Sequence, residues 1–171
     1  MAIALTASLV AHAPVNAADS SGETIVAAVE KICLPLIDGQ PLRTVASAAP
    51  GAVRDNVWTA ALPNRGEVRV RPPSAANPKV CSASISFAPG GHAAFIAALD
   101  AWAAGHAPPL RQLRRRDQSR TGDLQYWISS WTGGGGNGRT INVVFTEQAE
   151  LDGRPTDGGL MEAVLLVNVT P

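Results

Sequence analysis

The chain has 171 residues and a formal net charge of zero, with 14 Lys and Arg residues against 14 Asp and Glu residues. This length is typical of one domain that buries a core of its own. The balanced charge argues against a nucleic-acid partner, because nucleic-acid-binding proteins carry an excess of basic residues.

The N-terminal residues are typical of a secretory signal. An apolar run over residues 2–10 is followed by Val15-Asn16-Ala17, which offers small residues where signal peptidase cleaves. We therefore expect residues 1–18 to be a signal peptide and residues 19–171 to form the mature domain of a periplasmic or secreted protein. No basic residue precedes the apolar run, so a short buried N-terminal helix is the alternative. No stretch is long enough to cross a bilayer, and we expect no transmembrane span.

A helix is expected at the start of the mature domain. Ser20 and Glu23 have the spacing of a capping box. Apolar residues then recur at three- and four-residue steps over residues 25–36, so they share one face of a helix that carries Cys33. Pro35 should kink or end this helix, with Asp38-Gly39 as its stop. Residues 41–48 carry a weaker helix signal.

The next pattern is strand-like, and it places the second cysteine. Residues 79–87 alternate between apolar and serine side chains, which puts Cys81 on the apolar face. Cys33 and Cys81 are the only cysteines, so an oxidising compartment predicts one disulfide between helix and sheet. It would close a loop of about 49 residues and stabilise the fold by about 4 kcal/mol. Two buried free thiols are the alternative.

The remaining elements are one more helix and several strands. The second helix covers residues 92–104 and presents Phe95, Leu99 and Trp102 as one apolar stripe. The predicted strands cover residues 57–62, 67–71, 79–87, 110–119, 124–132, 140–147 and 160–169. The order is α-βββ-α-ββββ, which echoes itself loosely without a sequence repeat. We predict one α+β domain in which two main helices pack on a mostly antiparallel sheet.

A glycine-rich stretch, WTGGGGNGRT, runs from Trp131 to Thr140. A phosphate-binding loop would open a helix and commonly carry a lysine, whereas here a β-branched strand follows and no lysine is present. Asn137-Gly138 favours a type I′ turn, so we expect a hairpin tip, with a mobile flap or partner-contact loop as the alternative. Trp127 and Trp131 share one face of the preceding strand. They belong to the core if buried, and indicate sugar or peptide binding if exposed.

Arginines are concentrated in the strand predicted over residues 110–119. Charges on both of its faces indicate an edge strand protected against aggregation. The functional alternative is an anionic partner, such as lipid head groups, an acidic polysaccharide or an acidic protein. The candidate partner-binding residues are Arg111, Arg114, Arg115, Arg116, Arg120, Trp127, Trp131 and Arg139.

Signals for catalysis are weak. Glu147, Glu150 and Asp152 could support sugar hydrolysis, but clustering in sequence is a weak signal, and a solvated strand-to-turn edge is the favoured explanation. His92 and His106 would lie about 21 Å apart along one helix and could not share a metal, so we expect no metal or cofactor. We therefore expect a small non-catalytic binding protein of the cell envelope, with a small hydrolase as the alternative. Whether the protein is an enzyme stays open.

Overall fold

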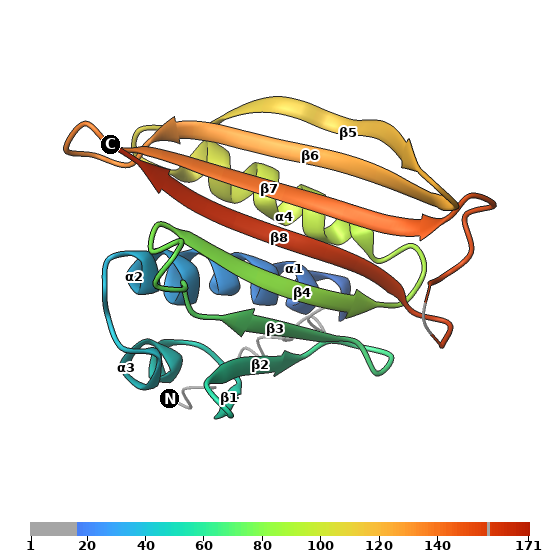
Figure 1. Ribbon diagram of the computed structural model, residues 1–171, viewed down its shortest axis with the longest axis horizontal. Coiled ribbons are helices and arrows are strands. Elements are labelled where there is room, and N and C mark those ends of the chain that lie inside the picture. The colour runs from blue at the N-terminus through green and yellow to red at the C-terminus, as the bar shows by residue number, and fades with distance from the viewer. Residues whose placement is uncertain (1–16, 157) are drawn as a thin grey trace, which may run out of the picture.

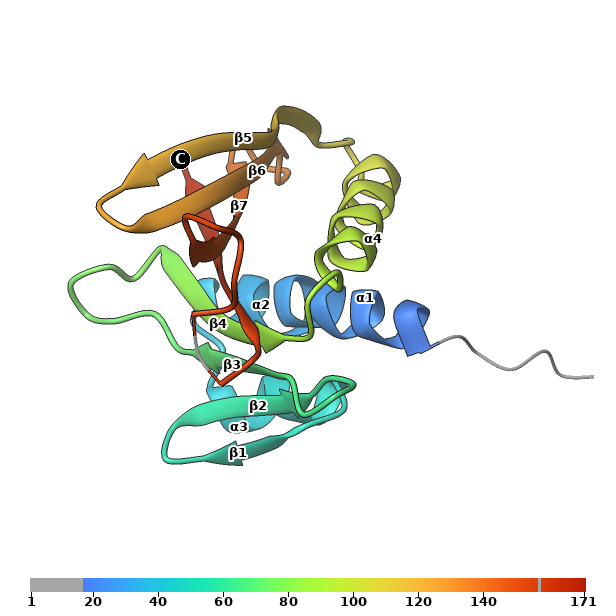
Figure 2. The same cartoon turned by 90° about the vertical axis from the view of Figure 1, so that its right-hand side faces the viewer.

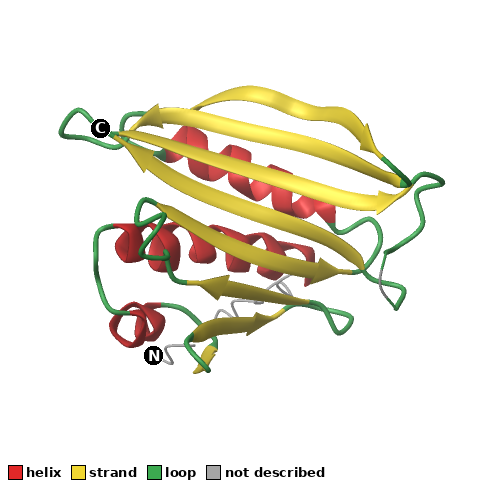
Figure 3. Cartoon of the chain, in the orientation of Figure 1, coloured by secondary structure: helices red, strands yellow, loops and turns green. Residues whose placement is uncertain are grey.

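Eight antiparallel strands form one sheet, and the two long helical segments pack against the same face of it (Figure 1). The computed structural model describes residues 17–156 and 158–171. Most of the predicted signal peptide, residues 1–16, thus lies outside the described residues. In Figure 3 the helices lie behind the strands, and no helix of the described residues covers the opposite face, which we call the open face.

The order of the elements is the predicted one, with one short strand added at the edge of the sheet. The helical segments are α1 (Ala17–Ala27), the π-helix η1 (Ala28–Cys33), α2 (Leu34–Ile37), α3 (Leu42–Val45), the 3₁₀ helix η2 (Ala46–Ala48) and α4 (His92–Gly105). The strands are β1 (Ala52–Arg54), β2 (Val57–Ala61), β3 (Glu67–Arg71), β4 (Val80–Phe87), β5 (Arg111–Thr121), β6 (Leu124–Gly134), β7 (Thr140–Glu150) and β8 (Met161–Thr170). The α+β prediction is confirmed.

The sheet is built from two similar units. The first unit, residues 17–87, is a long helical segment followed by the meander β1 to β4, and the second unit, residues 92–170, is α4 followed by the meander β5 to β8. The strand order is β1-β2-β3-β4-β8-β7-β6-β5, so the last strands of the two units pair at the centre. The two halves of the chain, which are loosely alike in their order of elements, therefore also have the same arrangement in space.

The first helical segment differs from the prediction at its beginning. Helix α1 already includes Ala17, so Ser20 lies inside the helix and the predicted capping box is wrong. Pro35 is the second residue of α2, which directly follows η1, so it lies at the start of a helical segment rather than ending the helix. The missing N–H of proline costs least near a helix start. The segment ends as predicted, where Gly39 adopts a φ of +86° and its N–H donates to the Leu36 carbonyl at 3.0 Å.

The core lies between the sheet and the helices. Inward residues alternate with outward ones along β7 and β8, and Val143, Leu165 and Val167 are fully buried. Phe95 of α4 packs edge-on against Phe87 at 5.0 Å between ring centroids, which fixes the helix over the centre of the sheet. Figure 2 shows α1 and α4 on the same side of the sheet.

The two helices approach each other closely at a glycine. A Cβ on Gly22 of α1 would lie 2.7 Å from the Cβ of Ala98 on α4. A side chain there would push the helices apart, so the absence of one lets the helical layers of the two units touch. The helical layer is therefore continuous over both halves of the sheet.

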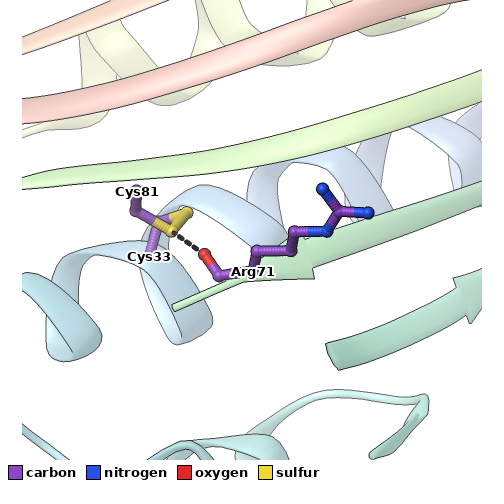
Figure 4. The surroundings of a disulfide bond; sticks show 3 residues. All are labelled: Cys33, Arg71 and Cys81. Carbon is purple, nitrogen blue, oxygen red and sulfur yellow. Dashed lines mark hydrogen bonds between the residues drawn. A yellow bond between two sulfur atoms is a disulfide. The ribbon is translucent and has the colours of Figure 1, made fainter. Parts of the chain in front are cut away.

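One disulfide joins the helical layer to the sheet, as predicted. Cys33, the last residue of η1, is bonded to Cys81 of β4, and their Cα atoms are 5.4 Å apart (Figure 4). Both cysteines are fully buried, and the Cys81 sulfur lies 3.8 Å from the carbonyl oxygen of Arg71 on the neighbouring strand. The alternative of two free thiols is wrong.

Candidate functional site

The predicted arginine strand is β5, and it lies at the edge of the sheet as predicted, hydrogen-bonded only to β6. Its pairing is irregular, with register shifts between Gln112 and Arg114 and between Arg114 and Asp117. Arg116, inside the second shift, has a φ of +52°. Such bulges bend an edge strand and redirect its side chains. With these bulges, arginine side chains of β5 lie on both faces of the sheet.

Three of the five β5 arginines form ion pairs. Arg114 lies 3.9 Å from Asp117 of its own strand, and Arg115 lies 3.6 Å from Asp100 of α4. Arg116 pairs with Glu147 of β7 on the face of the sheet that the helices cover. Arg111 and Arg120 are exposed and form no ion pair within residues 17–156 and 158–171. β5 therefore keeps two unpaired guanidinium groups and presents all five at its surface.

A buried carboxylate lies at the junction of α4 with β5, β6 and β7. Glu147 of β7 is 3% exposed, and its Oε2 accepts a hydrogen bond from Arg116 Nη2 at 3.3 Å. Its Oε1 lies 3.5 Å from Nδ1 of His92, the first residue of α4. The Arg116 guanidinium also lies 4.9 Å from the centroid of the Trp127 ring. The cluster ties the edge strand and the helix to the sheet.

The alternation of residues along β7 marks Glu147 as a buried carboxylate, although its closeness in sequence to Glu150 and Asp152 does not. Glu147 occupies an inward position in the alternation that contains Val143 and Phe145. A charged residue at an inward position requires a partner, because an unpaired buried charge is strongly destabilising. That partner comes from Arg116, which lies 31 residues away in sequence.

Glu147 lies apart from the other two predicted catalytic carboxylates. Glu147 faces the helices, whereas Glu150, three residues along the strand, faces the other side of the sheet. Glu150 and Asp152 both pair with Arg154, with 3.2 Å between Arg154 Nη2 and Glu150 Oε2. Glu147 is thus paired with Arg116 on one side of the sheet, while Glu150 and Asp152 share the exposed Arg154. The three acids do not provide two carboxyl groups on opposite sides of one substrate.

The predicted tryptophans belong to the interior. Trp131 is 2% exposed, and its indole N–H donates to Asp100 Oδ1 at 2.8 Å. Gln112 of β5 donates to the same oxygen at 3.1 Å. Trp127 is half-buried against the core. Neither ring forms a free aromatic platform for a sugar or peptide.

The glycine-rich stretch forms the predicted hairpin tip between β6 and β7. Asn137 and Gly138 have φ values of +50° and +77°, and the Arg139 N–H donates to the Gly136 carbonyl at 2.9 Å. Positive φ at both central residues is the requirement of a type I′ turn. Arg139 Nη2 donates to Asp38 Oδ1 at 2.6 Å, which connects the tip to the end of α2. Arg139 therefore serves the fold of the hairpin.

A groove on the outer side of the helices contains none of the predicted site residues. It has a volume of about 1180 Å³ and lies between α4 and the segment formed by α1 and η1; its lining includes alanines, Trp102 and the charged residues Glu23, Glu30 and Lys31. Within the described ranges, no three His, Cys, Asp or Glu residues are grouped so that they could hold a metal. No helix in the described part of the chain is long and apolar enough to span a membrane.

Comparison of the chain with protein families, with curated proteins and with solved structures found no match.

Proposed function

We propose that this protein is an exported, non-catalytic binding protein of the cell envelope, periplasmic or secreted, which holds an anionic partner through β5. The observation that carries the proposal is the exposed edge strand with five arginines, of which Arg111 and Arg120 have no ion pair within the described ranges. Guanidinium groups bind carboxylates and phosphates through paired hydrogen bonds, so a row of them suits an anionic surface.

The disulfide supports the compartment. Disulfides persist in oxidising compartments and are rare in the cytosol. The bond between Cys33 and Cys81 is buried on both sides, which is typical of a structural crosslink rather than a catalytic one. The signal-like pattern of residues 1–18 agrees with export.

The placement of the acids favours binding over the alternative of hydrolysis. Hydrolysis of a glycosidic bond commonly uses two carboxyl groups on opposite sides of that bond. Glu147 lies beneath α4 with Arg116, while Glu150 and Asp152 share Arg154 at the other side of the sheet. The hydrolase therefore ranks second.

Chromatography on immobilised poly-L-glutamate tests the binding surface. The double variant Arg111→Gln/Arg120→Gln should elute at clearly lower salt than the wild type, because it lacks the unpaired guanidinium groups of β5. The matched control is Arg43→Gln/Arg65→Gln, which removes the same charge from exposed positions outside β5. Equal shifts for both double variants would mean that net charge alone governs retention, and this would contradict a β5 binding surface.

A further inference from the structure

The open face of the sheet is ordered in rows across six strands. In one row the pairing register joins Arg71, Ser82, Leu166, Val144, Ser130 and Arg114. At the usual spacing of strands, the two arginine-bearing strands of this row lie about 24 Å apart. The row therefore has an arginine at each end and aliphatic side chains in the middle.

The middle of this face is apolar and accessible. Val164 and Leu166 point outward from the central strand β8 and are 42% and 39% exposed. Serines of β4 flank them on one side, and Val144 and Thr146 of β7 flank them on the other. Two exposed aliphatic side chains side by side at the centre of a sheet are a feature of contact surfaces, whereas isolated ones need no explanation.

A ladder of polar side chains stiffens the face next to these aliphatic residues. The Thr132 hydroxyl donates to Asn142 Oδ1 at 2.6 Å, and Asn142 Nδ2 donates to Asn168 Oδ1 at 2.9 Å. These hydrogen bonds span three strands on the outward side. Side chains that are already ordered lose less entropy when a partner binds.

The charges of the open face are separated along the strands. Arg71, Arg111 and Arg114 lie towards one end, and Glu67 and Glu162 lie towards the other. Glu67 pairs with Arg69, and Glu162 accepts a hydrogen bond from Thr156 at 2.9 Å. Asp117 on the same face pairs with Arg114. Arg71 and Arg111 at one end, and Glu162 at the other, have no ion pair in the part of the chain that the structure describes. The end of the face that contains Arg71 and Arg111 therefore carries unpaired positive charge.

We propose that the open face is a docking surface for a folded acidic protein. The partner would place apolar side chains over Val164 and Leu166, and its carboxylates would meet Arg71 and Arg111 or Arg114 at the two sides. An apolar centre with a polar rim and enriched arginine is the anatomy of protein–protein interfaces. A polyanion such as an acidic polysaccharide would gain nothing from the aliphatic centre. This inference rests on the proposed function, because Arg111 and Arg114 belong to both surfaces.

Site-specific photo-crosslinking in the native host tests the proposal. A photoreactive amino acid replaces Leu166 in one version of the full chain and Val164 in a second, so that one labelling position can fail without loss of the test. Other versions carry it at Arg120, on the helix side of β5, and at Glu30, on the outer helical surface. We expect an adduct with one acidic protein from the labels on β8 and none from Glu30.

Charge-reversal variants show whether the crosslinked protein is bound by the arginines of the open face or was captured by chance. Arg71→Glu/Arg114→Glu should reduce the adduct from β8 by about tenfold or more, because like charges would then face each other. Arg43→Glu/Arg65→Glu changes the net charge equally and should leave the adduct unchanged. Reversing the acidic residues of the captured partner should restore the adduct in the first double variant.

The remaining outcomes overturn one proposal or both. An adduct from Arg120 without any from β8 would overturn the docking face and leave the proposed function standing. No adduct from either position would overturn both. Three results with the labels on β8 would overturn the proposal of an acidic protein partner. The yield of the adduct could be unchanged by the charge reversal, the adduct could contain a second copy of this chain, or the captured molecule could be something other than a protein.

Discussion

The two units of the sheet share one architecture and attach their helices in different ways. In the first unit the helical segment is bonded to β4 through Cys33 and Cys81, with apolar packing around the bond. In the second unit α4 is held by carboxylates: Asp100 receives hydrogen bonds from β5 and β6, and Glu147 pairs with both α4 and β5. A helix can therefore be fixed to the same meander by a covalent bond or by buried polar contacts.

This difference also bears on the binding that we propose for the β5 edge of the sheet. The polar contacts of the second unit come largely from β5, so its arginines serve the fold and the surface together. The first unit needs no such contacts, and its edge strand β1 has only three residues. Stability in the second unit should accordingly be spread over several side chains, each with a smaller effect than the disulfide.

The largest effect is expected from removal of the covalent bond. Cys33→Ala/Cys81→Ala should lower the free energy of unfolding by about 4 kcal/mol, because the unfolded chain regains the freedom of a long loop. Equilibrium denaturation of the variant beside the wild type measures the difference. A loss below about 1 kcal/mol would contradict the covalent account of the first unit.

Asp100 should be next in size. Asp100→Ala removes the acceptor of the Trp131 indole N–H, which is buried, and should cost about 2 kcal/mol. Asp100→Asn keeps an acceptor oxygen and should cost clearly less. Denaturant unfolding of both variants checks the order, and equal losses would show that the hydrogen bond to Trp131 is not what holds α4.

Glu147 should matter less, although it is more deeply buried. Glu147→Gln leaves Arg116 without its counter-charge, but the Arg116 side chain is 43% exposed and can turn to water. We expect a loss of about 1 kcal/mol in the free energy of unfolding. A loss above about 3 kcal/mol, measured in the same way, would mean that Arg116 cannot leave the interior.

The smallest effect is expected at the surface. The Arg115 side chain is 73% exposed and 3.6 Å from Asp100. Arg115→Ala should change the free energy of unfolding by less than about 0.5 kcal/mol, because exposed ion pairs contribute little. A larger loss would show that β5 depends on this ion pair, and that the arginines cannot serve the surface without cost to the fold.

Much of the fold follows from short-range patterns in the chain. Alternation along residues 79–87 predicts both the strand β4 and the inward direction of Cys81, and with two cysteines only one disulfide is possible. Asn137-Gly138 predicts its own turn. The short strand β1 was missed, because three residues are too few to establish an alternation. The capping box failed because helical structure continues on the N-terminal side of Ser20.

The contacts of the candidate site depend on long-range geometry. Arg116 reaches Glu147 only because β5 shifts its register and Arg116 takes a positive φ, and no local pattern announces either. His92 meets Glu147 because α4 starts above β7, which is set by the packing of Phe95 and its neighbours. Sequence clustering grouped Glu147 with Glu150 and Asp152, whereas strand alternation separates them.

The intact mass of the protein from its native host tests the central claim, that this is an exported domain with a buried disulfide. Thiols are alkylated once before reduction and once after it. We expect a chain that begins at Ala18 or Asp19 and takes up alkyl groups only after reduction, since Cys33 and Cys81 are bonded. An uncut chain with two alkylated thiols before reduction would contradict export and the disulfide together.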